Sequence, residues 1–134
     1  MRDLETLYRQ AMYIVDDGEV NFTIRLGQEN TGLSQYLAAR KAHSWAFLTA
    51  YNPNSLPATP EQNAARQAEL IRIVEHQGYG YLNGYGTGEN WDPEASLFIL
   101  DISRENALEL GRNFGQSAFL WGETDRDPKL VWCQ

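Results

Sequence analysis

The stretch SWAFLTAYNPNS, residues 44–55, is apolar almost without interruption as far as Tyr51 and then changes into a run of amides and hydroxyls. An apolar run of strand length is typical of a strand that is buried on both faces of a sheet. The Asn-Pro-Asn-Ser run favours a turn, because proline fixes one backbone angle and asparagine side chains hydrogen-bond to nearby backbone. The stretch therefore predicts a central strand that ends in a polar turn.

Helices are predicted on either side of this strand, where apolar residues recur at helical spacing. The helix with the clearest start has Thr59 as its cap, Pro60 at its first position and Gln62 at the capping-box spacing. Asn30 or Thr31 can cap an earlier helix. The predicted helices span residues 3–10, 31–41, 59–77 and 103–113, of which the last three are the main ones.

Further strands are predicted before and after the central one. VNFTIRL, residues 20–26, alternates apolar and polar side chains, which is typical of a strand with one solvent-exposed face. SLFILDI, residues 96–102, is a second continuous apolar run, and SAFLWG and KLVWC predict two later strands. The Gly- and Tyr-rich segment YGYLNGYGTGENWDPEA, residues 79–95, is interpreted as one short strand followed by a flexible loop, which can act as a lid.

These elements predict a single globular domain over residues 1–134, of the α/β or α+β class. Its sheet is expected to be mixed, with about five to six strands flanked by the three main helices. A chain of 134 residues fits one domain with one core. The strand order stays open, because short strands with mixed connections allow several topologies.

The composition limits the classes of function. Eleven basic and eighteen acidic residues give a net charge of −7, which repels a phosphate backbone, so nucleic-acid binding is not expected. No stretch approaches the roughly 20 apolar residues of a membrane span, and MRDLETLYRQ lacks the apolar core of a signal peptide. The single cysteine, Cys133, cannot form an internal disulfide, which favours a reducing compartment. We therefore expect a cytoplasmic protein.

A polar pair heads the inward face of the helix predicted over residues 59–77. Asn63 and Arg66 lie three positions apart near its amino end, where free N–H groups and the helix dipole favour an anion. The same face continues through Leu70, Ile73 and Gln77. This end of the helix should lie beside the turn that follows the central strand. We therefore expect a pocket that binds a small anionic metabolite, lined by Asn52, Asn54, Ser55, Asn63 and Arg66.

A purely structural role for the same residues stays open. Asn52 can satisfy the backbone of its own turn, and Arg66 can pair with a nearby carboxylate that locks the helix in place. Gln116 follows Gly115 at the start of a late strand, where its amide can pack within the fold or reach the pocket. It lies at the same edge of the sheet as Asn52 only if the two strands are antiparallel.

Three segments, AFLTAYNPNS, EQNAARQAEL and GRNFGQSAFLWG, together resemble a bacterial family catalogued as domain of unknown function 3293 (DUF3293). The resemblance covers roughly residues 20–132 and keeps the order of the segments. Membership implies no particular activity. The resemblance points to five positions to examine, which are Asn52, Asn63, Arg66, Gly115 and Gln116.

Two other classes of function remain open. The chain can be a protein-interaction module that uses an acidic surface or exposed aromatic side chains such as Trp121 and Trp132. It can also be a small enzyme in which Glu94 or Glu89 does acid–base work beside Arg66. The two histidines and the cysteine lack the spacing of a zinc site, so no metal site is expected, and the cofactor is left unknown.

Overall fold

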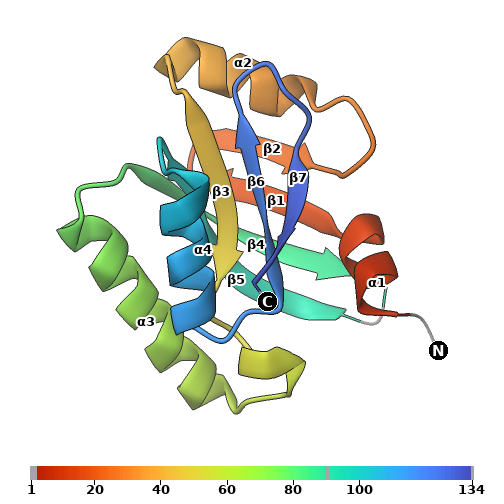
Figure 1. Ribbon diagram of the computed structural model, residues 1–134, viewed down its shortest axis with the longest axis vertical. Helices are drawn as coiled ribbons and strands as arrows, with labels where there is room; N and C mark the ends of the chain where they lie inside the picture. Colours follow the sequence, from red (N-terminus) through yellow and green to blue (C-terminus); the bar gives the residue numbers. More distant parts are fainter. Residues whose placement is uncertain (1–2, 90, 134) are drawn as a thin grey trace.

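Seven strands form one sheet within residues 3–89 and 91–133, the part of the chain that the computed structural model describes (Figure 1). Neighbouring strands are antiparallel throughout, in the order β2-β1-β4-β5-β3-β6-β7. Figure 1 shows β2, β1 and β4 lying across the direction of β3, β6 and β7, so the sheet is strongly curled. The strands are β1 (Met12–Asp17), β2 (Val20–Ile24), β3 (Ser44–Thr49), β4 (Tyr81–Gly88), β5 (Trp91–Leu100), β6 (Ala118–Glu123) and β7 (Lys129–Trp132).

Helices cover both faces of the sheet and complete a single α+β domain. Within the described residues they are α1 (Leu4–Gln10), α2 (Thr31–Arg40), α3 (Pro60–His76) and α4 (Arg104–Asn113), with one 3₁₀ turn, η1 (Pro53–Ser55). α3 and α4 pack on the face that carries Leu48 and Leu97, and α1 and α2 pack on the face that carries Trp45 and Phe98. None of these helices is long and apolar enough to cross a membrane.

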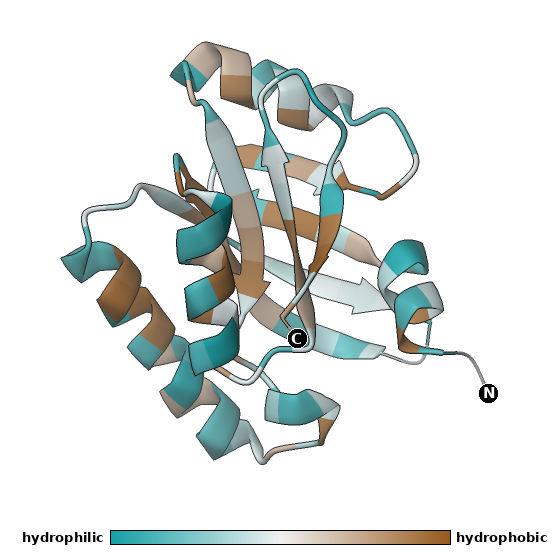
Figure 2. Ribbon diagram, viewed as in Figure 1, coloured by the Kyte–Doolittle hydropathy of each residue, from teal (hydrophilic) through white to brown (hydrophobic). Residues whose placement is uncertain are grey.

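The predicted central strand is confirmed. β3 lies between β5 and β6, and its four residues from Trp45 to Leu48 are buried. Figure 2 shows hydrophobic residues along most of β3 and hydrophilic residues at η1, directly after it. Burial on both faces explains the continuous apolar run, because neither face of this strand meets solvent. The polar turn therefore lies where the chain leaves the sheet.

The predicted starts of the three main helices are confirmed, with Asn30, Thr59 and Ser103 at the cap positions. At α3, Thr59 Oγ1 accepts the Gln62 N–H at 3.1 Å, and Gln62 Oε1 accepts the Thr59 N–H at 2.9 Å, which completes the capping box. At α4, where the sequence also places Ser103 as a cap before the helix, Ser103 Oγ accepts a backbone N–H of the first turn at 3.1 Å. At α2, Asn30 does not cap with its side chain, because its Oδ1 accepts the Arg25 N–H at 2.8 Å instead.

The mixed sheet of five to six strands is wrong. The sheet is entirely antiparallel, β1 was not predicted, and the Gly-rich segment forms β4 and the first part of β5 rather than a flexible loop or lid. Gly84 explains why a strand can be rich in glycine here, since a Cβ at this position would overlap the carbonyl oxygen of Ile14 on β1. Glycine permits the close approach of two strands at this point instead of ending one.

Candidate functional site

The start of α3 is joined to the backbone at which β3 leaves the sheet. Gln67 Oε1 accepts the Ala50 N–H at 3.1 Å, and Arg66 Nε donates to the Ala50 carbonyl at 3.2 Å. Asn63 Oδ1 accepts the Asn52 N–H at 2.8 Å, and Asn63 Nδ2 donates to Asn52 Oδ1 at 3.0 Å. Side chains of α3 thus pair backbone N–H and C=O groups that a neighbouring strand would pair within the sheet. The predicted proximity of Asn52 to the amino end of α3 is confirmed.

The inward face of α3 differs from the predicted one. Its buried residues are Asn63, Gln67, Leu70 and Val74. Ile73 is only half-buried, and Gln77 is exposed. Gln67, which is 7% exposed, was missed, although it lies four positions after Asn63 and therefore on the same side of a helix. The prediction continued from Asn63 by a spacing of three to Arg66, whereas the buried face continues from Asn63 by a spacing of four to Gln67.

Arg66 contacts the carbonyl groups of two loops. Besides its bond to Ala50, Arg66 Nη2 donates to the Phe114 carbonyl at 2.9 Å, and its guanidinium carbon lies 5.8 Å from the centre of the Phe114 ring. Among the described residues no carboxylate pairs with Arg66, so the predicted carboxylate partner is wrong. The positive charge is held by carbonyl dipoles and an aromatic face.

The turn after β3 has a strained backbone. Asn52, Asn54 and Ser55 have φ angles of 47°, 60° and 59°, in the left-handed region that asparagine tolerates and serine seldom adopts. The conformation is held from outside, because the Asn54 N–H donates to the Gly115 carbonyl at 2.6 Å and Ser55 Oγ lies 2.7 Å from Ser117 Oγ. Strain of this kind costs about 1–3 kcal/mol per residue and is concentrated at functional sites.

Gln116 lies at the same edge of the sheet as Asn52, because β6 is antiparallel to β3. It is 8% exposed, and its Nε2 atom donates to the Tyr51 carbonyl at 2.9 Å and to the Phe114 carbonyl at 3.2 Å. These two acceptors use both amide hydrogens and fix which side of the amide is nitrogen. The amide oxygen, Oε1, accepts no hydrogen bond from the described part of the chain.

Glu94 reaches the turn from β5. It is half-buried, and its Oε2 atom accepts a hydrogen bond from Asn52 Nδ2 at 2.8 Å. Burial raises the pKa of the Glu94 carboxyl above its usual value, and the hydrogen bond from Asn52 opposes that rise only in part. Asn52 thus orients a carboxylate through Nδ2 and anchors α3 through its backbone N–H and its Oδ1 atom.

Beside these groups lies a hollow of about 350 Å³, here named the Asn52 hollow. Its polar side is formed by Asn52, Ser55, Asp92, Glu94 and Gln116, and its apolar side by Leu4, Leu7, Tyr8, Tyr51, Pro57 and Trp91. Two carboxylates and no Lys or Arg of the described residues line it. Pockets of this size hold small molecules.

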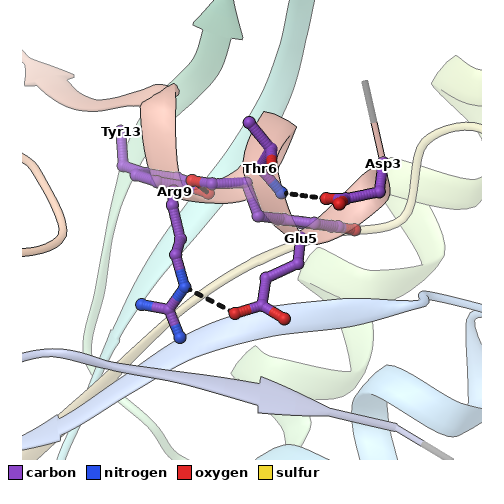
Figure 3. Close-up of polar contacts among 6 residues, drawn as sticks. Asp3, Glu5, Thr6, Arg9 and Tyr13 are labelled. Carbon is purple, nitrogen blue, oxygen red and sulfur yellow. Dashed lines mark hydrogen bonds and ion pairs between the residues drawn. The ribbon is translucent and has the colours of Figure 1, made fainter. Parts of the chain in front are cut away.

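One wall of the hollow is the short helix α1. Figure 3 shows its internal contacts, in which Asp3 accepts the Thr6 N–H at 2.7 Å and Arg9 pairs with Glu5 at 2.8 Å. The Tyr8 ring packs edge-on against Trp91 and against Trp132, with ring centres 5.8 Å apart in both pairs. Burial, together with the nearby Glu94 carboxylate, raises the pKa of Tyr8 to about 12, so the phenol stays neutral. No local pattern in the sequence indicates that this helix lies at the hollow, because Tyr8 contacts residues far away in the chain.

The structure divides the predicted site residues into two groups. The residues that line the Asn52 hollow are Asn52, Ser55, Gln116 and Glu94. Those that lie outside its lining are Asn54, Asn63, Arg66 and Glu89. Asn63 and Arg66 hold the turn after β3 through hydrogen bonds to the backbone of Asn52 and Ala50. Glu89 lies in a different turn, between β4 and β5.

Other residues singled out in the sequence lie away from the hollow or form no cluster. Cys133 is buried at 4% exposure in the core beneath α4. Trp121 is buried, whereas Trp132 is 39% exposed, and the predicted protein partner stays a prediction. No group of three or more His, Cys, Asp or Glu side chains that could hold a metal ion occurs in residues 3–89 and 91–133.

A family model described as "Protein of unknown function (DUF3293)" matches residues 48–119, more than half of the chain. The chain belongs to this family. The matched DUF3293 segment runs from the end of β3 into β6 and includes the turn, Glu94 and Gln116, whereas the α1 wall lies outside it. No curated protein and no solved structure matches the chain.

Proposed function

We propose that this DUF3293 chain binds a small polar molecule in the Asn52 hollow. The observation that carries the proposal is Gln116 Oε1, an amide oxygen of a nine-tenths buried side chain that lines the hollow and lacks a partner among the described residues. This oxygen is not among the fully enclosed unpaired polar atoms of the described residues, so water can reach it. A ligand that donates a hydrogen bond to it would take the place of that water.

The turn beside this oxygen supports the proposal. Three residues of one turn adopt left-handed backbone, and contacts from Gly115 and Ser117 keep them there. A turn with an unstrained backbone would connect β3 to α3 without this cost in free energy, so we expect the strained conformation to serve the function of the protein. Its effect is to present the Asn52 side chain to Glu94 at the edge of the hollow.

The anionic character of the ligand stays a prediction from the sequence. It was inferred from Arg66, which lies outside the lining and donates to the carbonyls of Ala50 and Phe114. Asp92 and Glu94 line the hollow and disfavour an anion there. Binding is therefore argued from the lining residues and does not depend on Arg66.

The proposal is tested by screening neutral, cationic and anionic polar fragments against the ¹⁵N-labelled chain by NMR. We expect saturable shifts of the backbone amides of the non-proline residues within 51–57, 91–94 and 115–117. Asp92→Trp should abolish them, because Asp92 is exposed at the rim and an indole there fills the hollow. Asp16→Trp, an equally exposed position on β1, is the matched control. Shifts that lie elsewhere, or that survive Asp92→Trp, would contradict the proposal.

Acid–base catalysis by Glu94 is a second candidate, favoured by one observation. Its carboxyl is half-buried, oriented by Asn52 and raised in pKa, which are the properties of a general acid or base. Fragments that bind should then be incubated with the unmutated protein and with Glu94→Gln. Chemical conversion by the former alone supports catalysis, and binding without conversion by either supports a binding protein.

A further inference from the structure

Two side-chain oxygens at the Asn52 hollow lack a hydrogen-bond partner among the described residues. Glu94 uses Oε2 for Asn52, which leaves its Oε1 atom, and Gln116 Oε1 is in the same state. The neighbouring amide nitrogens are engaged, because Asn52 Nδ2 donates to Glu94 and Gln116 Nε2 donates to two carbonyls. A molecule that bonds to both free oxygens must donate hydrogen bonds.

The rest of the lining favours an organic cation over a metal ion. The hollow offers two carboxylates, and the described residues contain no group of three or more His, Cys, Asp or Glu side chains that could hold a metal ion. Tyr8 and Trp91 present aromatic rings, which attract cations. Leu4 and Leu7 add apolar surface on the α1 side that can cover an alkyl chain.

Resting on the function proposed above, we infer that the ligand is an alkylammonium or guanidinium compound. Its charged nitrogen lies between Glu94 and Gln116 and donates to the free oxygen of each side chain. Its alkyl part lies against α1 and Trp91. Asp92 at the rim adds a second negative charge that attracts the same cation.

The test compares three probes of equal chain length on the full ¹⁵N-labelled chain: n-butylammonium, n-butanol and n-butyrate, at fixed ionic strength and pH 7. We expect n-butylammonium to shift the amides of Asn52, Glu94 and Gln116 saturably. It should bind about tenfold more tightly than n-butanol, because a hydrogen bond to a charged group is stronger than a neutral one. Butyrate should leave these amides unshifted.

Two variants assign the effect to one carboxylate. Glu94→Gln keeps the length of the side chain and an oxygen for Asn52 Nδ2, and should weaken n-butylammonium binding about tenfold. Glu19→Gln makes the same change of charge at an exposed position in the turn between β1 and β2, and should leave the affinity unchanged.

The outcomes separate this inference from the proposed function. If neutral or anionic fragments bind at the hollow and n-butylammonium does not, the cationic ligand is refuted and the binding function stands. The same holds if n-butylammonium binds equally well to Glu94→Gln. If no probe and no fragment shifts the amides of the hollow, both the inference and the proposed function fail.

Discussion

Arg66→Met should lower the free energy of unfolding by about 2–3 kcal/mol. The change removes two charge-assisted hydrogen bonds, to Ala50 and Phe114, each worth about 1 kcal/mol at a half-buried site where water competes. It also removes the cation–π contact with Phe114, worth about 0.5 kcal/mol. Methionine keeps the apolar stem of the side chain, so the loss reports on the guanidinium.

The assay is urea unfolding followed by tryptophan fluorescence, with thermal unfolding as a second readout. For a chain of this length, 2–3 kcal/mol corresponds to a fall in Tm of about 7–10 °C. Arg66→Lys should lose about half as much, because an ammonium group cannot reach both carbonyls in the geometry of the guanidinium. Arg72→Met, on the exposed face of the same helix, should leave the urea midpoint nearly unchanged.

An unchanged or increased free energy of unfolding for Arg66→Met would refute this reasoning. It would mean that the two hydrogen bonds to carbonyls gain no more free energy than the partial desolvation of the guanidinium costs. A charge held without benefit to stability is expected where a residue is kept for binding. In that case the anionic ligand predicted from the sequence would become the favoured one, with Arg66 as its partner.

Three further predictions follow from the structure. Burial raises the pKa of Glu94 in the folded chain, so the Glu94 carboxyl contributes most to stability below the usual glutamate pKa. This contribution is lost as the pH rises through the raised pKa of the folded chain, and Glu94→Gln should remove that pH dependence from the urea midpoint. Gly84→Ala should cost about 3 kcal/mol by forcing β1 from β4, whereas Gly86→Ala, whose Cβ meets only Tyr13 Cδ1 at 3.9 Å, should be nearly neutral. The buried Cys133 thiol should react with a disulfide reagent only as fast as the chain opens.

Each of these predictions has a clear contrary result. A pH profile of Glu94→Gln that matches the unmutated protein would show that this carboxyl is solvated. Equal losses for Gly84→Ala and Gly86→Ala would contradict the pairing of β4 with β1 at Ile14. Stoichiometric labelling of Cys133 within the mixing time would place the thiol at the surface.

Local signals predicted the elements that depend on local physics. The Thr59–Gln62 capping box and the Ser103 cap involve residues three positions apart, so the sequence contains all the participants. The apolar run at residues 44–55 also predicted the central strand, because a strand buried on both faces consists almost entirely of apolar residues. These features hold whatever the topology of the sheet.

Non-local contacts account for the errors. The Gly-rich segment resembles a loop in the sequence, because the residue that requires glycine at position 84 is Ile14 on another strand, about 70 positions away in the chain. The α1 wall of the hollow is invisible in the sequence for the same reason, since Tyr8 meets Trp91 and Trp132 only in the folded chain. The hollow itself is formed by such contacts, so the sequence named its turn, Glu94 and Gln116 but not its α1 wall.

The polar cluster after β3 combines two tasks, and the contacts separate them. Asn63, Arg66 and Gln67 bond to backbone groups of Ala50 and Asn52 that no neighbouring strand reaches, so their amides and charge belong to the fold. Glu94 and Gln116 instead keep one oxygen each toward the hollow. Replacing a residue of the first group should lower stability and binding together, because the turn moves. Glu94→Gln should lower ammonium binding while the chain stays folded, and that dissociation is what a binding site at this turn requires.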